Sequence, residues 1–517
     1  MHKKFKKNKV LDYLSLILLR FTVLISISML LFLSVMSLLY TSYLREDYVE
    51  VILYKKDAFI ITIIIAIIFA IIMQCISRKW NRCRKIYILY LMIYVMVLGI
   101  TWIMMCRTSP ISDQGFVSMI ASQFLDGCYN QLNKGGYLYT YPYQLGIIGF
   151  IEIIYSIVGK DNYIFVMILN VFALCISFYY LYKISIEIFK DDKSSMFTIV
   201  LLAGCISSIF YCTYVYGTLF GLMFALVGVY YQLRYYNTDK IRYAFVSMIL
   251  IVIAVILKSN YLIVLIASVI MLLFKFLNNR KIIIFIIIGM FFIGNALANS
   301  ALYNYYEVVS DKKINEGAPK LLWIAMGLQN GHGGEGWYNE FNWNVYNDNY
   351  DSKKSNEIAK ESINTSIKNF IKNPSYALKF FYRKIVSQWN EPTYQSLWGS
   401  HYAGQHTGTL SKVVMSIYHG RLNKIILEYL NIYHFIIWSC ALYFFIRNRK
   451  TITVQQVYLI IIVIGGFLFH IMWEAKAQYI LPYFIMVIPY SAKGLRDILE
   501  DGMSYIRKNY NKSKNIS

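Results

Sequence analysis

Long apolar runs recur along the whole chain and are separated by short polar turns. A helix needs about 20 apolar residues to cross a bilayer. The runs predict crossings near residues 15–41, 58–77, 86–106, 163–183, 195–213, 215–233, 243–257, 260–276, 281–299, 431–446, 454–472 and 478–494. The first run is too long for a signal peptide and no small-residue cleavage site follows it, so we expect a retained span. The pattern predicts an all-α polytopic membrane protein with about 12 transmembrane helices.

Two polar regions interrupt the apolar series, at residues 107–162 and 300–430. The second is large enough for a small domain, and its helical patterns at 355–373 and 375–389 predict a mainly helical extracytoplasmic loop domain. The expected division is 1–106 N-terminal transmembrane helices, 107–162 outer catalytic loop with juxtamembrane helices, 163–299 central transmembrane helices, 300–430 extracytoplasmic domain, 431–494 C-terminal transmembrane helices and 495–517 basic cytoplasmic tail.

Charge supports a membrane protein and sets its expected orientation. Charged residues are only 15% of the chain, whereas soluble domains carry about a quarter. The net charge of +23 lies mostly in short turns and tails, which indicates cytoplasmic turns and anionic lipid rather than nucleic acid. We therefore expect a multi-pass plasma-membrane protein with cytoplasmic termini, and the richness in Ile, Lys, Asn and Tyr is typical of an AT-rich bacterial genome. The basic groups are Lys3, Lys4, Lys6, Lys7 and Lys9; Arg78, Lys79, Arg82, Arg84 and Lys85; Lys183, Lys190 and Lys193; Arg234, Lys240 and Arg242; Lys275, Arg280 and Lys281; and Arg447, Arg449 and Lys450.

One apolar segment, Tyr143–Gly159, is expected not to cross. As a helix it would span about 25 Å, short of a core of about 30 Å, and it contains Glu152. If it crossed, Lys183, Lys190 and Lys193 would face outward, against the positive-inside rule. We expect a re-entrant or surface-lying helix on the outer side.

The stretch "SPISDQGFVSMIASQFLDG" (residues 109–127) follows the third span. Phe116, Ile120 and Phe124 recur every four residues, which predicts an amphipathic helix at the interface. Ser112 or Asp113 could cap this helix through a short acceptor side chain. The same position would also hold the Asp113 carboxylate at the membrane surface as a general base, and the two interpretations are compatible.

A second stretch, "NKGGYLYTYPYQLGIIGF", returns the chain to the membrane. Its tyrosines are spaced by two, which is typical of an interfacial aromatic belt. Aromatic faces also suit sugar rings, so one or two of these tyrosines could line a site.

Together the two stretches resemble the first outer loop of the GT-C fold glycosyltransferases that depend on polyprenyl phosphate. The resemblance is to the bacterial branch related to protein O-mannosyltransferases and aminoarabinose transferases. It implies that Asp113 is the catalytic base, which deprotonates an acceptor hydroxyl that then displaces polyprenyl phosphate with inversion. Family members often carry a second acid beside the first, and here that position is Gln114. The resemblance assigns no cofactor, and it leaves open whether a divalent metal binds at this loop.

Further residues take their expected roles from the same resemblance. Lys258 lies at an outer turn, where a lysine either snorkels or meets an anion, and the family suggests contact with the lipid phosphate. "HIMWEAKAQYILPYF" similarly gives Lys476 as a weaker phosphate-binding candidate. The substrate-binding candidates are Gln114, Tyr141, Glu474, Gln478 and Trp337. We expect Asp113, Lys258 and the turn at 474–478 to surround one outer cavity.

The histidines of the large loop do not indicate a metal site. His332, His401 and His406 lack an acidic partner at a diagnostic spacing and are expected to be surface residues rather than metal ligands.

The predicted function is transfer of a sugar from a polyprenyl-phosphate donor to an envelope glycan, lipid or protein on the outer face. The alternatives are a flippase or transporter for lipid-linked sugars, which would place functional charges within spans, and a non-catalytic envelope polysaccharide assembly protein. Membrane lipids are expected partners and nucleic acid is not. Neither the sugar nor the acceptor is identified by these residues.

Labelling of a cysteine introduced near Lys160 tests the orientation of the Tyr143–Gly159 segment. We expect a membrane-impermeant maleimide added from outside to label it, because both ends of the segment are placed on the outer side. Labelling from the cytoplasm instead would refute the assignment.

Overall fold

The computed structural model describes residues 9–45, 50–77, 84–348, 350–402 and 404–514. Lys3, Lys4, Lys6, Lys7, Arg78, Lys79 and Arg82, which were used to orient the chain, lie outside the described residues.

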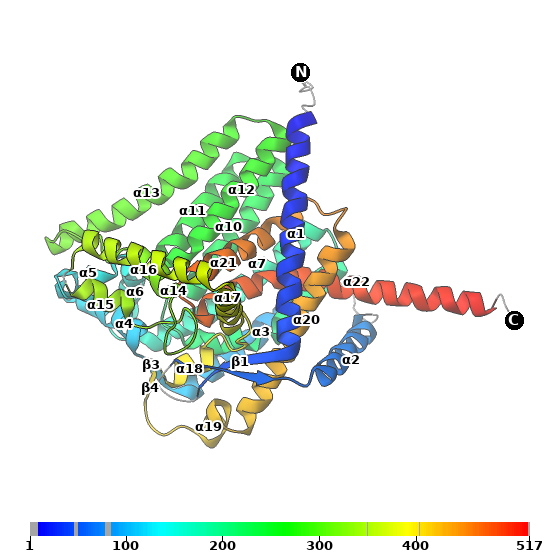
Figure 1. Ribbon diagram of the computed structural model, residues 1–517, viewed down its shortest axis with the longest axis horizontal. Helices are drawn as coiled ribbons and strands as arrows, with labels where there is room; N and C mark the ends of the chain where they lie inside the picture. The colour runs from blue at the N-terminus through cyan, green and yellow to red at the C-terminus, as the bar shows by residue number, and fades with distance from the viewer. Residues whose placement is uncertain (1–8, 46–49, 78–83, 349, 403, 515–517) are drawn as a thin grey trace.

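Every expected span is helical in the structure (Figure 1). The bundle helices are α1 (Lys9–Leu39), α2 (Phe59–Ser77), α3 (Arg84–Cys106), α7 (Tyr163–Phe189), α8 (Asp192–Gly204), α9 (Ile206–Phe210), α10 (Thr218–Thr238), α11 (Ile241–Leu257), α12 (Leu262–Asn279), α13 (Ile283–Ser310), α20 (Arg421–Asn448), α21 (Tyr458–Met472) and α22 (Leu481–Lys514). The all-α polytopic membrane fold is thereby confirmed.

Fewer helices qualify as complete spans than the apolar runs suggested. Within the described ranges, eight helices are long and apolar enough to cross a membrane, or up to ten if each bent pair is one span. Helix α11 has only 17 residues, and α10 and α22 carry charged residues, such as Arg234 and Arg496. The segment around Pro142 is one of the bent pairs, with an angle of 100°.

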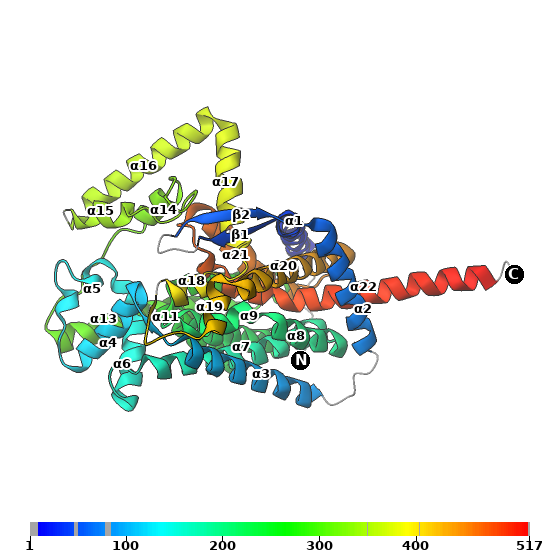
Figure 2. The same ribbon diagram turned by 90° about the horizontal axis from the view of Figure 1, so that it is seen from below.

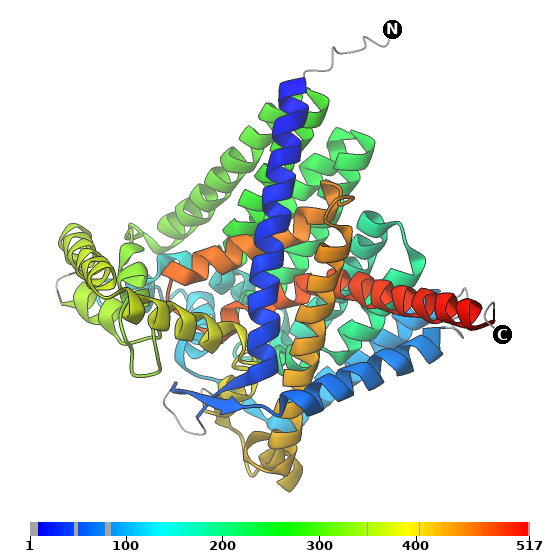
Figure 3. The ribbon, with the colours of Figure 1, turned by 45° about the vertical axis from the view of Figure 1, so that its right-hand side comes forward.

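Helices α1 and α20 run side by side along one face of the bundle (Figure 3). At its C-terminal end α1 continues into a hairpin of β1 (Tyr40–Leu44) and β2 (Ile52–Lys56), antiparallel with Tyr40 opposite Lys56. The second small sheet pairs β3 (Thr108–Pro110) with β4 (Gly404–His406). These short sheets join the bundle helices to the outer loops.

The juxtamembrane region forms α4 (Ser112–Leu125), α5 (Tyr137–Thr140) and α6 (Leu145–Val158). The predicted apolar face of α4 is buried only in part: Ile120 and Phe124 are buried, whereas Phe116 is exposed. It packs on α6, where Ser118 is hydrogen-bonded to Tyr155 at 2.6 Å. The expected cap is wrong: the residue before the helix is Ile111, and no side chain caps the first turn.

The outer loop domain is mainly helical, as predicted. It comprises α14 (Leu321–Gly327), α15 (Phe341–Asn347), α16 (Ser352–Lys372), α17 (Pro374–Trp389), α18 (Ser396–His401) and α19 (Lys412–His419). Figure 2 shows α16 and α17 as two arms of a bend that stands away from the bundle. Asp351 begins α16 by accepting hydrogen bonds from the amides of Lys353 (2.9 Å) and Lys354 (3.1 Å), as an N-cap does.

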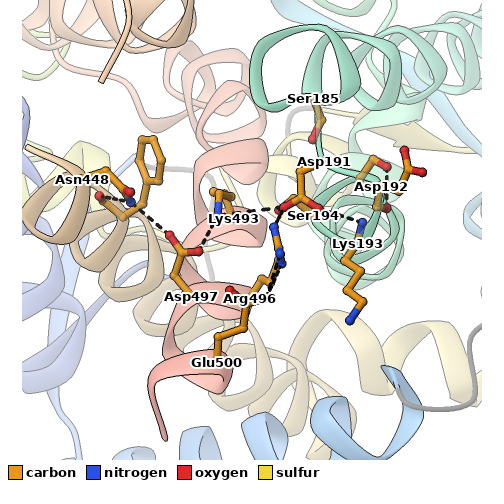
Figure 4. A network of polar contacts seen from close by, with 12 residues as sticks. Ser185, Asp191, Asp192, Lys193, Ser194, Asn448, Lys493, Arg496, Asp497 and Glu500 are labelled. Atoms are coloured by element: carbon orange, nitrogen blue, oxygen red, sulfur yellow. Dashed lines mark hydrogen bonds and ion pairs between the residues drawn. The ribbon is translucent and has the colours of Figure 1, made fainter. Parts of the chain in front are cut away.

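Ionic contacts gather at the opposite end of the bundle. Asp191, before α8, contacts Arg496 and lies 3.9 Å from Lys493 on α22 (Figure 4). Asp497 accepts from Asn448 of α20 at 3.0 Å. Other basic turns meet in the same way, such as Lys281 with Asp239 at 2.6 Å. Turns that are distant in sequence are therefore tied together by charge at one end of the structure.

Close packing of α6 against α11 gives a stability prediction. A methyl group on Gly146 would collide with the backbone carbonyl oxygen of Ile256, which cannot move like a flexible side chain. We expect Gly146→Ala to lower the stability by about 1–3 kcal/mol, as overpacking does, measured as a lower melting temperature in detergent. The matched control is Gly289→Ala on α13, where a methyl group meets open space. Equal melting temperatures for both variants would contradict this packing.

Candidate functional site

The candidate site begins at the entrance to α4, where the backbone is strained. Arg107 and Ser112 have φ of 47° and 57°, a left-handed region that residues with a β-carbon rarely adopt. Between them, β3 is held by β4 of the outer loop. Such conformations persist only where the surrounding structure enforces them, and they cluster at functional sites. This strained entrance places Asp113 in the first turn of α4.

Asp113 is exposed and is held by a tyrosine. The hydroxyl of Tyr137 donates to Asp113 Oδ1 at 3.2 Å, and the ring of Tyr137 stacks on Phe116 with centroids 4.7 Å apart. Tyr137 also lies close to Tyr216, which precedes α10. We call Tyr137 and Tyr216 the tyrosine bridge, because they connect Asp113 to the next charged group.

That next group is Lys258, at the end of α11. Its ammonium lies 3.9 Å from the ring centroid of Tyr216 and 5.7 Å from that of Tyr479. In the described part of the chain no carboxylate forms an ion pair with it. Burial lowers the pKa of Lys258 to about 8, while the negative charge of Asp113 opposes that decrease. A half-buried cation that meets aromatic rings, and no paired carboxylate among the described residues, is suited to receive an external anion.

A narrow cleft leads away from Lys258. Its volume is about 20 Å³, and it is lined by Lys258 and Gln478 together with Val264, Pro482 and Met486 of α12 and α22. Polar groups therefore stand at the outer turn and apolar side chains follow along the transmembrane helices. The expectation of one cavity holds for Lys258 and Gln478, whereas Asp113 does not line this cleft and reaches it through the tyrosine bridge.

The turn between α21 and α22 holds a compact ionic group. Lys476 Nζ lies 3.4 Å from Glu50 and 3.9 Å from Glu474. The segment is not helical, so residues two apart in sequence can meet. Burial alone lowers the pKa of Lys476, but Glu50, Glu474 and Asp113 together raise it above its usual range. Lys476 is therefore a permanently charged partner of two carboxylates.

Glu474 is buried and accepts a hydrogen bond from the Tyr479 hydroxyl at 3.2 Å. Burial raises its pKa to about 7, and Lys476 opposes that increase. Its protonation therefore changes near neutral pH, and the charge of the turn changes with it.

A turn of the outer domain, residues 391–395, closes the site from the side. Gln395 accepts a hydrogen bond from the amide of Gln478 at 3.2 Å and donates to Glu50 at 3.3 Å. Tyr394 and Gln395 have φ of 52° and 59°. Buried Glu391 holds this strained turn by accepting from the amides of Thr393 (2.9 Å) and Gln395 (2.6 Å).

The remaining predicted residues lie at the edge of the site or behind it. Gln114 is buried and accepts from the amide of Val215 at 2.9 Å, which ties α4 to the segment before α10. Trp337 is completely buried and donates to Ser387 at 2.8 Å, so its ring presents no open face to a sugar. Tyr141 is partly buried and stacks on Trp343 at 6.4 Å. Of the two aromatic residues, Tyr141 and Trp337, only Tyr141 has a ring that is partly exposed near the site.

The residues present do not fit a divalent metal beside Asp113. The side-chain oxygen of Gln114 is committed to Val215, and Glu50 and Glu474 face an ammonium group. Among the described residues, no group of three or more His, Cys, Asp or Glu side chains could hold a metal ion.

The expectation for two loop histidines changes. His401 and His406 are half-buried rather than surface residues, and His401 Nε2 lies 3.3 Å from His419 Nε2. Burial and, less strongly, the neighbouring His419 lower the pKa of His401 to about 4. The three rings pack together at β4.

Sequence reasoning missed Glu50, Tyr216 and Gln395. Each enters the site through a contact with a residue distant along the chain, and none stands in a motif. Glu50 is one of several acids in the short loop between the first two spans, and nothing in that loop distinguishes it from Glu46 and Asp47.

Comparisons with known proteins add little to this geometry. No protein-family model matches the chain, and no curated protein matches it. One solved structure that resembles it is the archaeal oligosaccharyltransferase AglB from Archaeoglobus fulgidus, in complex with an inhibitory peptide and a dolichol-phosphate. The TM-score is 0.44 with 12% identity, over 84% of this chain and 52% of that one. The chain thus spans about half the length of AglB.

The Lys476 group predicts a pH-dependent stability loss. In Lys476→Met, Glu474 and Glu50 lose their shared cation, so we expect a loss of about 3 kcal/mol at pH 8. The loss should shrink toward pH 5.5, because Glu474, with its raised pKa, is then protonated in the folded protein and needs no cation. Thermal unfolding in detergent across this range measures it.

Two further variants serve as controls for this experiment. Exposed Lys379→Met should leave the melting temperature unchanged at both pH values. Adding Glu474→Gln to Lys476→Met should recover part of the loss, since one uncompensated charge is removed. A loss that is independent of pH would contradict the ionic origin.

Proposed function

We propose that the protein is an integral membrane glycosyltransferase of the GT-C class. It moves a sugar from a polyprenyl-phosphate donor to an envelope glycan, lipid or protein on the outer face of a bacterial plasma membrane. The reaction inverts the configuration at the sugar carbon, and Asp113 is the base.

The observation that supports this proposal most is the pairing of unlike charges through the tyrosine bridge. An exposed carboxylate, Asp113, and a half-buried lysine, Lys258, are connected by two tyrosines. Lys258 also stands at the head of a cleft whose remaining lining includes apolar side chains of the bundle. A lipid phosphate has this same order of groups, with an anionic head above an apolar chain.

The proposed chemistry uses these two charges in one displacement. Asp113 takes the proton from the acceptor hydroxyl as the hydroxyl oxygen forms a bond to the anomeric carbon. The bond from that carbon to the phosphate oxygen breaks on the opposite face, and the phosphate leaves with the electron pair. Lys258 stabilises the charge that develops on the departing phosphate. The Tyr137 hydroxyl keeps Asp113 oriented toward the acceptor.

Lys476 has a different part in this proposal. Because Glu50 and Glu474 already compensate its charge, it is less available to the donor phosphate than Lys258. We assign it to holding Glu474 and the turn that carries Gln478, and its contact with phosphate is secondary. Tyr141 and Gln478 are left as the sugar-facing candidates.

Asp113→Asn tests the catalytic assignment. The amide keeps the size of the side chain and can still meet Tyr137, but it cannot accept the proton. We expect transfer to fall about 10²–10⁴-fold, as for the loss of a general base, with normal membrane insertion. Mass spectrometry of envelope glycans from cells whose sole copy is the variant measures the product.

Asp126→Asn is the matched control, since Asp126 stands at the other end of α4 and forms an exposed pair with Lys160, which contributes little. It should retain full activity. Wild-type glycans in the Asp113→Asn strain would refute the catalytic role and favour a transporter or assembly protein. Lys258→Met should also abolish transfer, while Lys258→Arg should keep part of it.

A further inference from the structure

A larger cavity lies outside the candidate site, on the other side of the 391–395 turn. Its volume is about 440 Å³, within the range of about 300–1,000 Å³ for small-molecule sites. It is enclosed by the β1–β2 hairpin, the segment from 391 to 402, and the first turns of α20. Asp113, Lys258 and the tyrosine bridge do not contribute to its lining. We call it the outer cavity.

Regular structure explains how its walls are assembled. Alternate residues of a strand share one face, and Thr41 and Tyr43 of β1 line the cavity, as do Leu44 and Arg45 where the strand ends. Lys55 stands opposite Thr41 in the register and joins them. Residues four apart lie on the same side of a helix, as Asn423 and Leu427 of α20 do here.

The lining combines aromatic rings with hydrogen-bonding groups. Tyr43, Trp398 and Tyr402 come from three separate positions around the cavity, and Thr393 and Asn423 add a hydroxyl and an amide. A sugar ring offers apolar C–H faces for aromatic packing and hydroxyls around its edge for polar groups. A fatty chain would make no use of the polar groups, so the lining favours a carbohydrate.

The charged side chains that line the cavity indicate which kind of carbohydrate would bind there. The lining carries three cations, Arg45, Lys55 and Lys424, and two acids, Glu391 and Glu428. Glu428 forms an ion pair with Lys55. Glu391 is turned into its own loop, where two amides and a hydroxyl donate to it, and burial raises its pKa to about 7. Among the described residues that line the cavity, cations therefore outnumber acids by one, and within this part of the chain Lys424 has no ion-pair partner.

The position of the outer cavity relates it to the candidate site. The turn at 391–395 is a shared wall: Glu391 and Thr393 line the cavity, while Gln395 contacts Glu50 and Gln478 on the side of the site. A ligand in the cavity would thus lie one turn of chain away from the residues that surround Lys476.

We propose that the outer cavity binds an anionic sugar unit of the acceptor, one that carries a carboxylate or phosphate, away from the hydroxyl that reacts. This inference rests on the proposed function and names the acceptor class as an acidic glycan. The N-terminal hairpin, which supplies one wall, gains a role in acceptor recognition.

Saturation-transfer NMR on the purified full chain tests the proposal, with glucuronic acid, glucose 1-phosphate and neutral glucose as probes. We expect the two anionic sugars to bind at least tenfold more tightly than glucose. Lys424→Glu should weaken both by about tenfold or more through charge reversal, and Trp398→Ala should weaken all three sugars. Lys360→Glu, on exposed α16, makes the same charge change far from the cavity and should have no effect.

Several outcomes would overturn the proposal. Equal binding of glucose and the anionic sugars would remove the charge argument, and binding unchanged in both Lys424→Glu and Trp398→Ala would place the sugar elsewhere. Vesicles of phosphatidylglycerol form a separate arm. If they displace glucose 1-phosphate from the wild type but not from Lys424→Glu, a lipid headgroup is the occupant and the glycan assignment is wrong.

This experiment is independent of transfer activity. Asp113→Asn should bind the anionic sugars like the wild type. If Asp113→Asn binds the anionic sugars but the wild type transfers no sugar, the proposed function is wrong and the cavity assignment stands. If the wild type transfers sugar but binds no anionic sugar, the cavity assignment is wrong and the proposed function stands.

Discussion

The ionic group around Lys476 is the contact on which the arrangement of the outer face depends. Removing a charge from water costs several kcal/mol unless an opposite charge meets it, and Lys476 meets two, on Glu50 and Glu474. Those carboxylates belong to the hairpin after α1 and the turn before α22. Their shared cation therefore holds the two ends of the chain together beside Lys258, which has aromatic rings in place of a carboxylate. The two lysines therefore differ: the charge of Lys476 is compensated by two carboxylates, whereas Lys258 contacts aromatic rings and can pair with an external anion.

Buried charges also meet opposite charges at the other end of the bundle, where α8 contacts α22. Asp191, Lys493, Arg496 and Asp497 join α8 to α22 (Figure 4), and Lys275, whose side chain is completely buried, lies 2.6 Å from Asp239. Between these ends, apolar side chains gain little from leaving lipid, so packing of small residues against backbone decides the fit. Gly146 against α11 is one such place. Ion pairs thus connect the helices at both ends of the bundle, and close packing of small residues connects them in between.

These forces explain what the sequence could predict. Apolar length is a local property, so every span was found as a helix, but the period of four in α4 placed only Ile120 and Phe124 correctly on its buried face, because Phe116 is exposed. Fewer helices qualify as full crossings than there are apolar runs, because α10, α11 and α22 are short or partly polar. Asp113 and Lys258 stood in recognisable stretches. Glu50 and Gln395 did not, because their roles arise from contacts across the fold, and the buried positions of Gln114 and Trp337 depend on partners that no local pattern specifies. The missing cap of α4 reflects the strained backbone at Ser112, which is enforced by the outer domain through β4.

The pairing of Glu50 with Lys476 also bears on how the protein is made. The hairpin is synthesised well before the turn that carries its ionic partner. Until then Glu50 has no counter-charge, the 391–395 turn lacks its contact with Gln478, and the wall beside Lys258 is open. A chain that stalls or is truncated before α22 would carry Asp113 into the membrane without a closed site around it. The site is therefore completed only after the turn that carries Glu474 and Lys476 has been made.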